Sequence, residues 1–111
     1  PIVSYFSILQ NTKIGYNWYM KTAFEYGKLE IILKGVANHN RLKILELLER
    51  KPELSVSDIS DELKVGYENI SDHIRKLAAA GLVMKRHDGN SVLHKITSRA
   101  VSILVFCKKL K

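Results

Sequence analysis

Hydrophobic and polar positions between Glu53 and Thr97 follow a helical period first and a strand period afterwards. Residues 55–63 and 67–81 each read as an amphipathic helix, and Lys64-Val65-Gly66 interrupts the period between them. The second segment places its apolar residues on one stripe, and Gly81 suits the left-handed conformation that ends many helices. That stripe consists of Ile70, Ile74, Leu77 and Ala78.

A β-hairpin is predicted directly after the second helix. Leu82 opens a strand, Asp88-Gly89-Asn90 is a tight-turn signal, and residues 91–96 return as the partner strand. Residues 53–56 are a candidate short strand against this hairpin. We expect Ser57 to cap the first helix, with Asp58 beside its positive end. Helix, turn, helix and hairpin in this order outline a winged helix-turn-helix.

The flanking segments predict further helices and a mainly α fold. Residues 16–34 favour a helix, although Gly27 weakens its middle. Asn38 is a good N-cap for a helix that Pro52 ends, and Thr97 or Ser98 can cap a last helix. Residues 1–13 fit neither period and form an arm of uncertain structure.

The last helix is apolar on nearly every side, and such a helix is rarely left against water. We therefore divide one compact domain into an N-terminal arm and dimerisation helix (1–34), a winged helix-turn-helix (35–97) and a C-terminal dimerisation helix (98–111). Plain core packing is the competing explanation for the first helix, and Cys107 either packs or bridges two chains. The predicted homodimer interface comprises Trp18, Phe24, Leu29, Val101, Leu104, Val105 and Cys107.

Composition narrows the class of protein. The chain has 111 residues, of which 46% are hydrophobic, enough for one small core. No run is long enough to span a membrane and no signal-peptide pattern is present, which predicts a soluble cytoplasmic protein. A single cysteine excludes an internal disulfide framework and any CxxC motif.

The net charge of +7 is unevenly distributed. Residues 82–111 carry seven basic side chains against Asp88 alone, for +6, whereas residues 35–81 carry −1. The lysines from 108 to 111 suit a solvated helix end, but those of the hairpin cluster on one small element. A binding role is therefore harder to dismiss for Lys85, Arg86 and Lys95 of the hairpin than for the tail lysines.

Helical spacing in residues 67–79 gives a candidate surface for reading DNA. Arg75 can pair with guanine, Asn69 with adenine, and Ser71 with a base or a phosphate. Glu68 and Asp72 form an acidic i, i+4 pair on the same face, which weakens binding to phosphate. The candidate DNA-binding residues are Tyr67, Glu68, Asn69, Ser71, Asp72, His73, Arg75 and Lys76 on the helix and Lys85, Arg86 and Asn90 on the hairpin.

Neither a metal site nor a catalytic site is predicted. The spacing of the four histidines, His39, His73, His87 and His94, does not match that of metal ligands. His87 and His94 lie on the two predicted strands, but the predicted turn does not place them directly across from each other. Ser71 and His73 do not face each other on a helix, and no glycine-rich phosphate loop exists. We therefore expect no enzyme, no metal and no cofactor.

Three stretches carry a family resemblance. Residues 35–48, 53–63 and 70–83 resemble the first helix, the second helix and the recognition helix with its exit in ArsR/SmtB-type regulators. The resemblance spans Gly35 to Ile96, although MarR-like and PadR-like chains share much of the pattern. It implies a homodimeric transcriptional regulator that places the helix from Tyr67 in the major groove and the wing along the backbone. His73 matches the family's histidine at this position, and contact with a phosphate and packing on the helix surface are both open for it.

The chain departs from the family pattern at the positions where members of the family bind metal ions. A Cys-x-Cys metal pair of the family corresponds here to Ser55 and Ser57, and hydroxyls are poor ligands for soft ions. Residues 99–111 contain none of the Asp, His or Glu ligands of the family's other common site. We expect neither metal nor thiol-pair sensing, and no small-molecule effector is identifiable.

The sequence thus predicts a homodimeric, sequence-specific DNA-binding regulator. Two alternatives stay open. One is a winged-helix protein-interaction module whose acidic face no longer enters DNA, and the other is a non-specific architectural DNA binder, supported by the wing charge and opposed by the −1 of residues 35–81.

Overall fold

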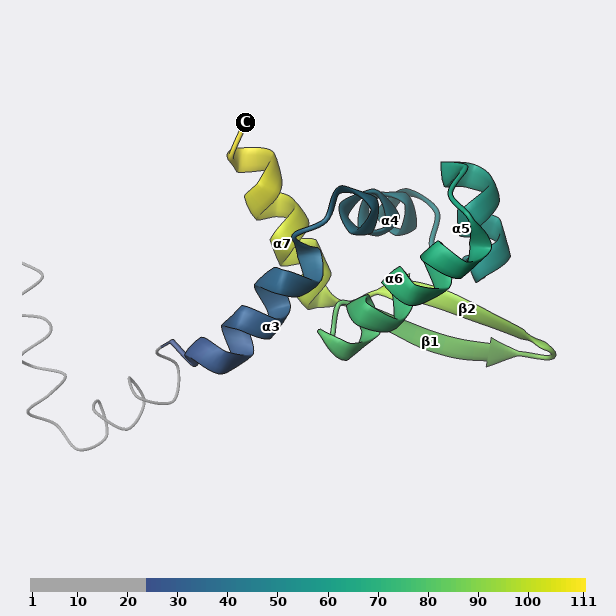
Figure 1. Ribbon diagram of the computed structural model, residues 1–111, viewed down its shortest axis with the longest axis horizontal. Helices are drawn as coiled ribbons and strands as arrows, with labels where there is room; N and C mark the ends of the chain where they lie inside the picture. The colour runs from purple at the N-terminus through teal and green to yellow at the C-terminus, as the bar shows by residue number, and fades with distance from the viewer. Residues whose placement is uncertain (1–23) are drawn as a thin grey trace, which may run out of the picture. The chain divides into compact units, whose positions relative to one another are not determined.

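The computed structural model describes residues 24–111, so the arm at 1–13, Trp18 and the first part of the helix predicted at 16–34 lie outside the described residues. Residues Ile31–Lys111 form one compact unit. The described elements are α3 (Tyr26–Val36), α4 (His39–Arg50), α5 (Val56–Leu63), α6 (Tyr67–Ala79), β1 (Val83–Asp88), β2 (Ser91–Ile96) and α7 (Ser98–Lys109) (Figure 1). None of these helices has the length and apolarity needed to cross a membrane. The predicted mainly α fold with a hairpin wing is confirmed.

Side-chain caps set the starts of three helices. Asn38 caps α4 as predicted, because its Oδ1 accepts from the backbone N–H groups of Asn40 at 2.9 Å and Arg41 at 3.1 Å. Thr97 caps α7 by accepting from the N–H of Ala100 at 3.3 Å. The cap of α5 is Ser55 rather than the predicted Ser57.

The capping box of α5 explains the correction. Ser55 accepts from the N–H of Asp58 at 3.1 Å, and the Asp58 carboxylate accepts from the N–H of Ser55 at 3.2 Å. A hydroxyl at Ser57 lies already inside the first turn, since the helix begins at Val56. The reciprocal pair satisfies two backbone donors that a helix start otherwise leaves open.

The core gathers one apolar stripe from each helix of the compact unit. Ile70, Ile74 and Leu77 of the α6 stripe are buried as predicted, whereas Ala78 is half-buried. The largest neighbouring side chains come from α4 and α5. Burying these stripes fixes which face of α6 is turned to solvent. The core residues with essentially no exposed surface include Ile44, Leu45, Leu47, Leu48, Ile59, Ile70, Leu77, Leu82 and Ala100.

The hairpin pairs Val83 with Ile96 at its base and Asp88 with Ser91 at its tip. This leaves Gly89 and Asn90 as a two-residue turn, in which Gly89 has a φ of 62°. Only Leu54 of the candidate strand at 53–56 pairs with the hairpin, through an isolated antiparallel bridge to His94. The link fastens β2 to the connection between α4 and α5.

The exit of α6 is closely packed against two other elements. A Cβ added to Gly35 on α3 would lie 2.7 Å from the Cβ of Ala80. Gly81 has a φ of 73°, which confirms the predicted left-handed helix end, and the Arg99 guanidinium beside it donates to the carbonyl of Ala80 at 3.0 Å. These contacts hold the C-terminal end of α6 in place.

Candidate nucleic-acid interface

The solvent face of α6 displays most of the residues that the sequence predicted. Tyr67 is 57% exposed at the start of the helix, and Glu68, Asn69, Arg75 and Lys76 are also exposed. Ser71, Asp72 and His73 are partly buried along the flanks. The helix is therefore anchored on one side and offers a polar surface on the other.

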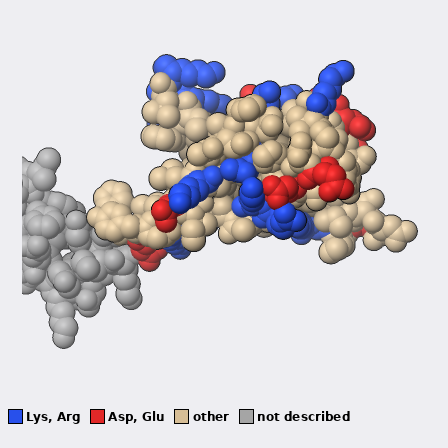
Figure 2. Space-filling view, in the orientation of Figure 1, with Lys and Arg blue, Asp and Glu red and all other residues tan. Residues whose placement is uncertain are grey.

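Asp72 does not stand free on this face. Its Oδ1 accepts a hydrogen bond from the Arg75 guanidinium, and its Oδ2 lies 3.1 Å from the Lys76 ammonium. The hydrogen bond from Lys76 is the main reason that the pKa of Asp72 is below its ordinary value. Acidic and basic atoms accordingly lie side by side over α6 in Figure 2.

His73 is turned toward the body of the protein. Its Nδ1 lies 3.3 Å from a guanidinium nitrogen of Arg41, whose Nε donates to the carbonyl of Gly35 at 2.7 Å. Burial, followed by the nearby Arg41, lowers the pKa of His73, so the neutral ring that accepts from Arg41 is favoured. This geometry supports a packing role for His73 rather than a phosphate contact.

The wing presents Lys85, Arg86 and Asn90 to solvent. Arg86 is already engaged, because its Nε and one terminal nitrogen donate to the two carboxylate oxygens of Glu53 at 2.8 and 3.1 Å. The hydrogen bond from Arg86 lowers the pKa of Glu53 below its ordinary value. Lys85 makes no ion pair with any residue that the structure describes.

Sequence reasoning missed Glu53 and Arg41. Glu53 is 33 residues from Arg86 and Arg41 is 32 residues from His73, so no local pattern links either pair. Glu53 also has a left-handed φ of 65°, which a glutamate rarely adopts.

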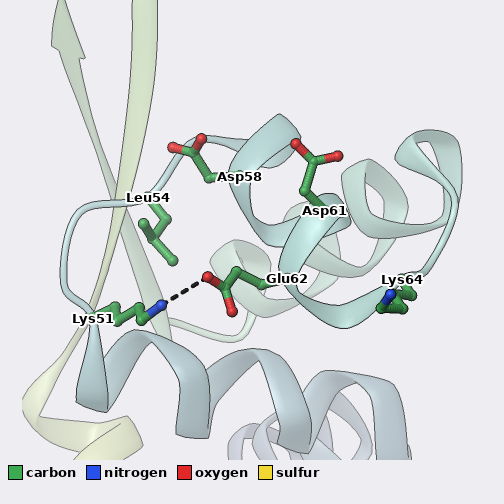
Figure 3. Close-up of a pocket in the computed structure, with 6 residues that line it drawn as sticks. All are labelled: Lys51, Leu54, Asp58, Asp61, Glu62 and Lys64. Carbon is green, nitrogen blue, oxygen red and sulfur yellow. Dashed lines mark hydrogen bonds and ion pairs between the residues drawn. The ribbon is translucent and has the colours of Figure 1, made fainter.

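An acidic hollow of about 600 Å³ lies between α5 and the segment from Lys51 to Leu54 (Figure 3). Asp58, Asp61 and Glu62 contribute its carboxylates, and Glu62 is paired with Lys51 at 2.7 Å. Its three carboxylates outnumber Lys51 and Lys64, the two lysines that also line it, so this hollow is unsuited to a phosphate backbone.

The histidines of the hairpin are separated, as the turn prediction required. His87 pairs with Val92 and His94 with Lys85 across the two strands. His94 is 2% exposed, and its Nδ1 lies 2.9 Å from the carbonyl of Leu54. Within residues 24–111, no group of three His, Cys, Asp or Glu side chains is placed to hold a metal ion.

The predicted interface residues of α7 fall on two different faces. Val101 and Val105 are 40% and 44% exposed, whereas Leu104 is 5% exposed and belongs to the core of its own chain. The exposed apolar face of α7 also includes Phe106, which the sequence did not single out, and Cys107 is a partly buried free thiol. Residues 24–30 are described separately from this unit, and there Phe24 is exposed and Leu29 is partly buried.

Comparison with known proteins shows which family shares this architecture. Residues 38–85 match the family described as "Bacterial regulatory protein, arsR family". The chain is 33% identical over 78 residues to the transcriptional activator HlyU of Vibrio cholerae, a match that covers 70% of this chain and 71% of HlyU. The chain belongs to the ArsR family. It is thus a transcriptional regulator with a winged helix-turn-helix DNA-binding fold, in a family of regulators rather than enzymes.

Other ArsR-family relatives agree with this placement. The arsenic resistance transcriptional regulator ArsR1 of Pseudomonas putida is 30% identical over 66 residues, which are 60% of this chain and 52% of that regulator. The chain thus spans about half the length of this relative.

Solved structures show the same fold. HlyU from Vibrio cholerae superimposes with a TM-score of 0.68 at 29% identity, covering 78% of this chain and 97% of that one. The winged helix-turn-helix domain of Mb0332 from Mycobacterium bovis, described as homodimeric, has a TM-score of 0.70 at 24% identity and covers 76% of this chain and 78% of that one.

Proposed function

We propose that this ArsR-family protein is a homodimeric, sequence-specific DNA-binding regulator that inserts α6 into the major groove and lays the wing along the phosphate backbone. The observation that carries the proposal is the anchored α6, whose solvent face holds Asn69 and Arg75 while the opposite stripe is buried. Arg and Asn are the side chains best suited to guanine and adenine edges. Regulation without a metal ion is part of the proposal, because the serines at 55 and 57 replace soft ligands.

The dimer rests on the apolar face of α7. Val101, Val105 and Phe106 lie exposed on a helix whose other side is buried, and exposed apolar residues at helical spacing favour a partner surface. The homodimeric Mb0332 domain shares this fold, which supports the same assembly here. Two copies related by a two-fold axis present two α6 helices to successive major grooves.

Selection from a random duplex pool, followed by fluorescence anisotropy at low and near-physiological salt, tests the proposal. We expect an enriched motif with two-fold symmetry that survives the higher salt. Arg75→Ala should relax the preference at one base position by about 1–3 kcal/mol. Lys85→Ala should weaken binding to every duplex and flatten the salt dependence by about 0.9 in log–log slope.

Lys109→Ala is the matched control, since it removes one cation at the end of α7. It should leave the base preference unchanged. Equal losses on all sequences from Arg75→Ala and Lys85→Ala would contradict base reading by α6. Binding that vanishes with salt and enriches nothing would instead favour a protein-interaction module.

A further inference from the structure

Both candidate DNA-binding elements carry a guanidinium that is already held by a carboxylate. On the wing, Glu53 accepts from Arg86 through both of its oxygens, at 2.8 and 3.1 Å. On α6, Asp72 places one oxygen on Arg75 and the other on Lys76. The two carboxylates come from different parts of the chain, but each one pairs with an arginine among the candidate DNA-binding residues.

These pairs leave donors free. A guanidinium has five N–H groups, and Glu53 takes two of those on Arg86, one from Nε and one from a terminal nitrogen. Three N–H groups remain, and all of them lie at the terminal end of the side chain. Arg86 is 55% exposed, so this end is open to a phosphate while the carboxylate keeps the fork in one orientation.

The same pairs reduce the charge that loosely bound DNA meets. Asp72 offsets part of the charge of Arg75 and Lys76 on α6, and Glu53 offsets that of Arg86 on the wing. Binding without sequence preference depends almost entirely on free cations, whereas in a specific complex the base contacts, and the phosphate contacts that fix the register, depend on where the donor points. A carboxylate that orients an arginine therefore opposes the first kind of binding more than the second.

We propose that Glu53 and Asp72 are positioning residues that set how strongly the protein distinguishes its target duplex from other DNA. They hold the guanidinium groups of Arg86 and Arg75 in the orientation that the target duplex requires. Their negative charges also offset the positive charge that attracts DNA of any other sequence. This inference rests on the proposed DNA-binding function and extends it to two acidic residues that do not themselves need to touch DNA.

Glu53→Gln and Asp72→Asn test the inference, because each removes one negative charge at an exposed site. The wild-type protein and both variants are titrated with the enriched duplex and with a scrambled duplex across a salt series. Affinity for the scrambled duplex should rise about fivefold per variant near 0.15 M salt, with a log–log slope steeper by about 0.9. Affinity for the enriched duplex should rise less than about twofold, because the lost orientation offsets the gained charge.

Glu46→Gln is the matched control. It removes the same charge and releases Arg50 from a 3.5 Å ion pair on α4, outside α6 and the wing. It should leave the ratio of the two affinities unchanged. Thermal unfolding of all variants verifies that each one folds.

Equal increases on both duplexes, no change in either, or the same shift in Glu46→Gln would overturn the inference. A wild-type protein that enriches no sequence rejects the proposed function before any variant is compared. A wild-type protein that discriminates, with variants that keep its ratio, rejects this inference alone.

Discussion

The contact between α3 and the exit of α6 gives the sharpest stability prediction. Replacing Gly35 with alanine adds a methyl group 2.7 Å from the Cβ of Ala80, whereas carbon atoms in contact normally lie about 3.5–4.0 Å apart. Ala80 is 3% exposed and sits where α6 ends. Neither methyl group can rotate away, so the backbone of α3 or of α6 has to move.

The expected magnitude follows from two opposing effects. Overpacking of a core contact typically costs about 1–3 kcal/mol. Alanine in place of glycine in a helix recovers up to about 1 kcal/mol. Gly35→Ala should therefore lower the free energy of unfolding by about 0.5–2 kcal/mol. Gly27→Ala, in the same helix but with no atom within 4 Å of the added Cβ, should be neutral or stabilising.

Urea unfolding measures the change in the free energy of unfolding for Gly35→Ala and for Gly27→Ala. The protein concentration is held fixed, because association between copies shifts the apparent stability. Ala80→Gly opens the space, so the double variant of Gly35→Ala with Ala80→Gly should lose less than the sum of the two single variants. We expect a coupling free energy of at least about 1 kcal/mol. A Gly35→Ala protein as stable as the wild type, or additive losses in the double variant, would refute the close approach of α3 to α6.

Three further predictions concern the cap of α5, the buried histidine and the dimer. Ser55→Ala should cost about 1 kcal/mol in urea unfolding while Ser57→Ala stays within about 0.5 kcal/mol, and the reverse order would place the cap at Ser57. Burial lowers the pKa of His94, so as the pH falls the unfolded chain binds a proton before the folded chain does. The free energy of unfolding should therefore decrease below about pH 6.5, by at most about 1.4 kcal/mol per pH unit. His94→Gln should flatten this dependence in unfolding curves from about pH 7.5 to 5. Val105→Glu should convert a sedimenting dimer into a folded monomer, and an unchanged mass for wild type and variant would exclude a dimer through α7.

The sequence by itself determined the elements whose signals are local. Asn38, Gly81 and the Gly89-Asn90 turn act within a few residues, because a cap or a turn depends on the conformation of its own short segment. The stripe of α6 was likewise readable from its period, and it fixed the face on which the candidate DNA-reading residues lie. The order of helices and hairpin was enough to predict the winged helix-turn-helix.

Tertiary structure decided which side of an ambiguous helix is buried. The apolar residues of α7 lie on nearly every side of the helix, so their spacing does not indicate which side faces the core. Only packing in the compact unit separates buried Leu104 from exposed Val105. The cap of α5 is a different case, since Ser55 and Asp58 form a capping box within four residues, and this local pair favours Ser55 over Ser57.

The pairing of charges also required the folded chain. The sequence predicts Arg86 only as a candidate DNA contact on the wing, whereas the bridge between Leu54 and His94 brings Glu53 to it across 33 residues. Arg41 reaches His73 in the same way, from one helix to another. Such pairs depend on how separate elements are placed in space, which no periodicity along the chain encodes.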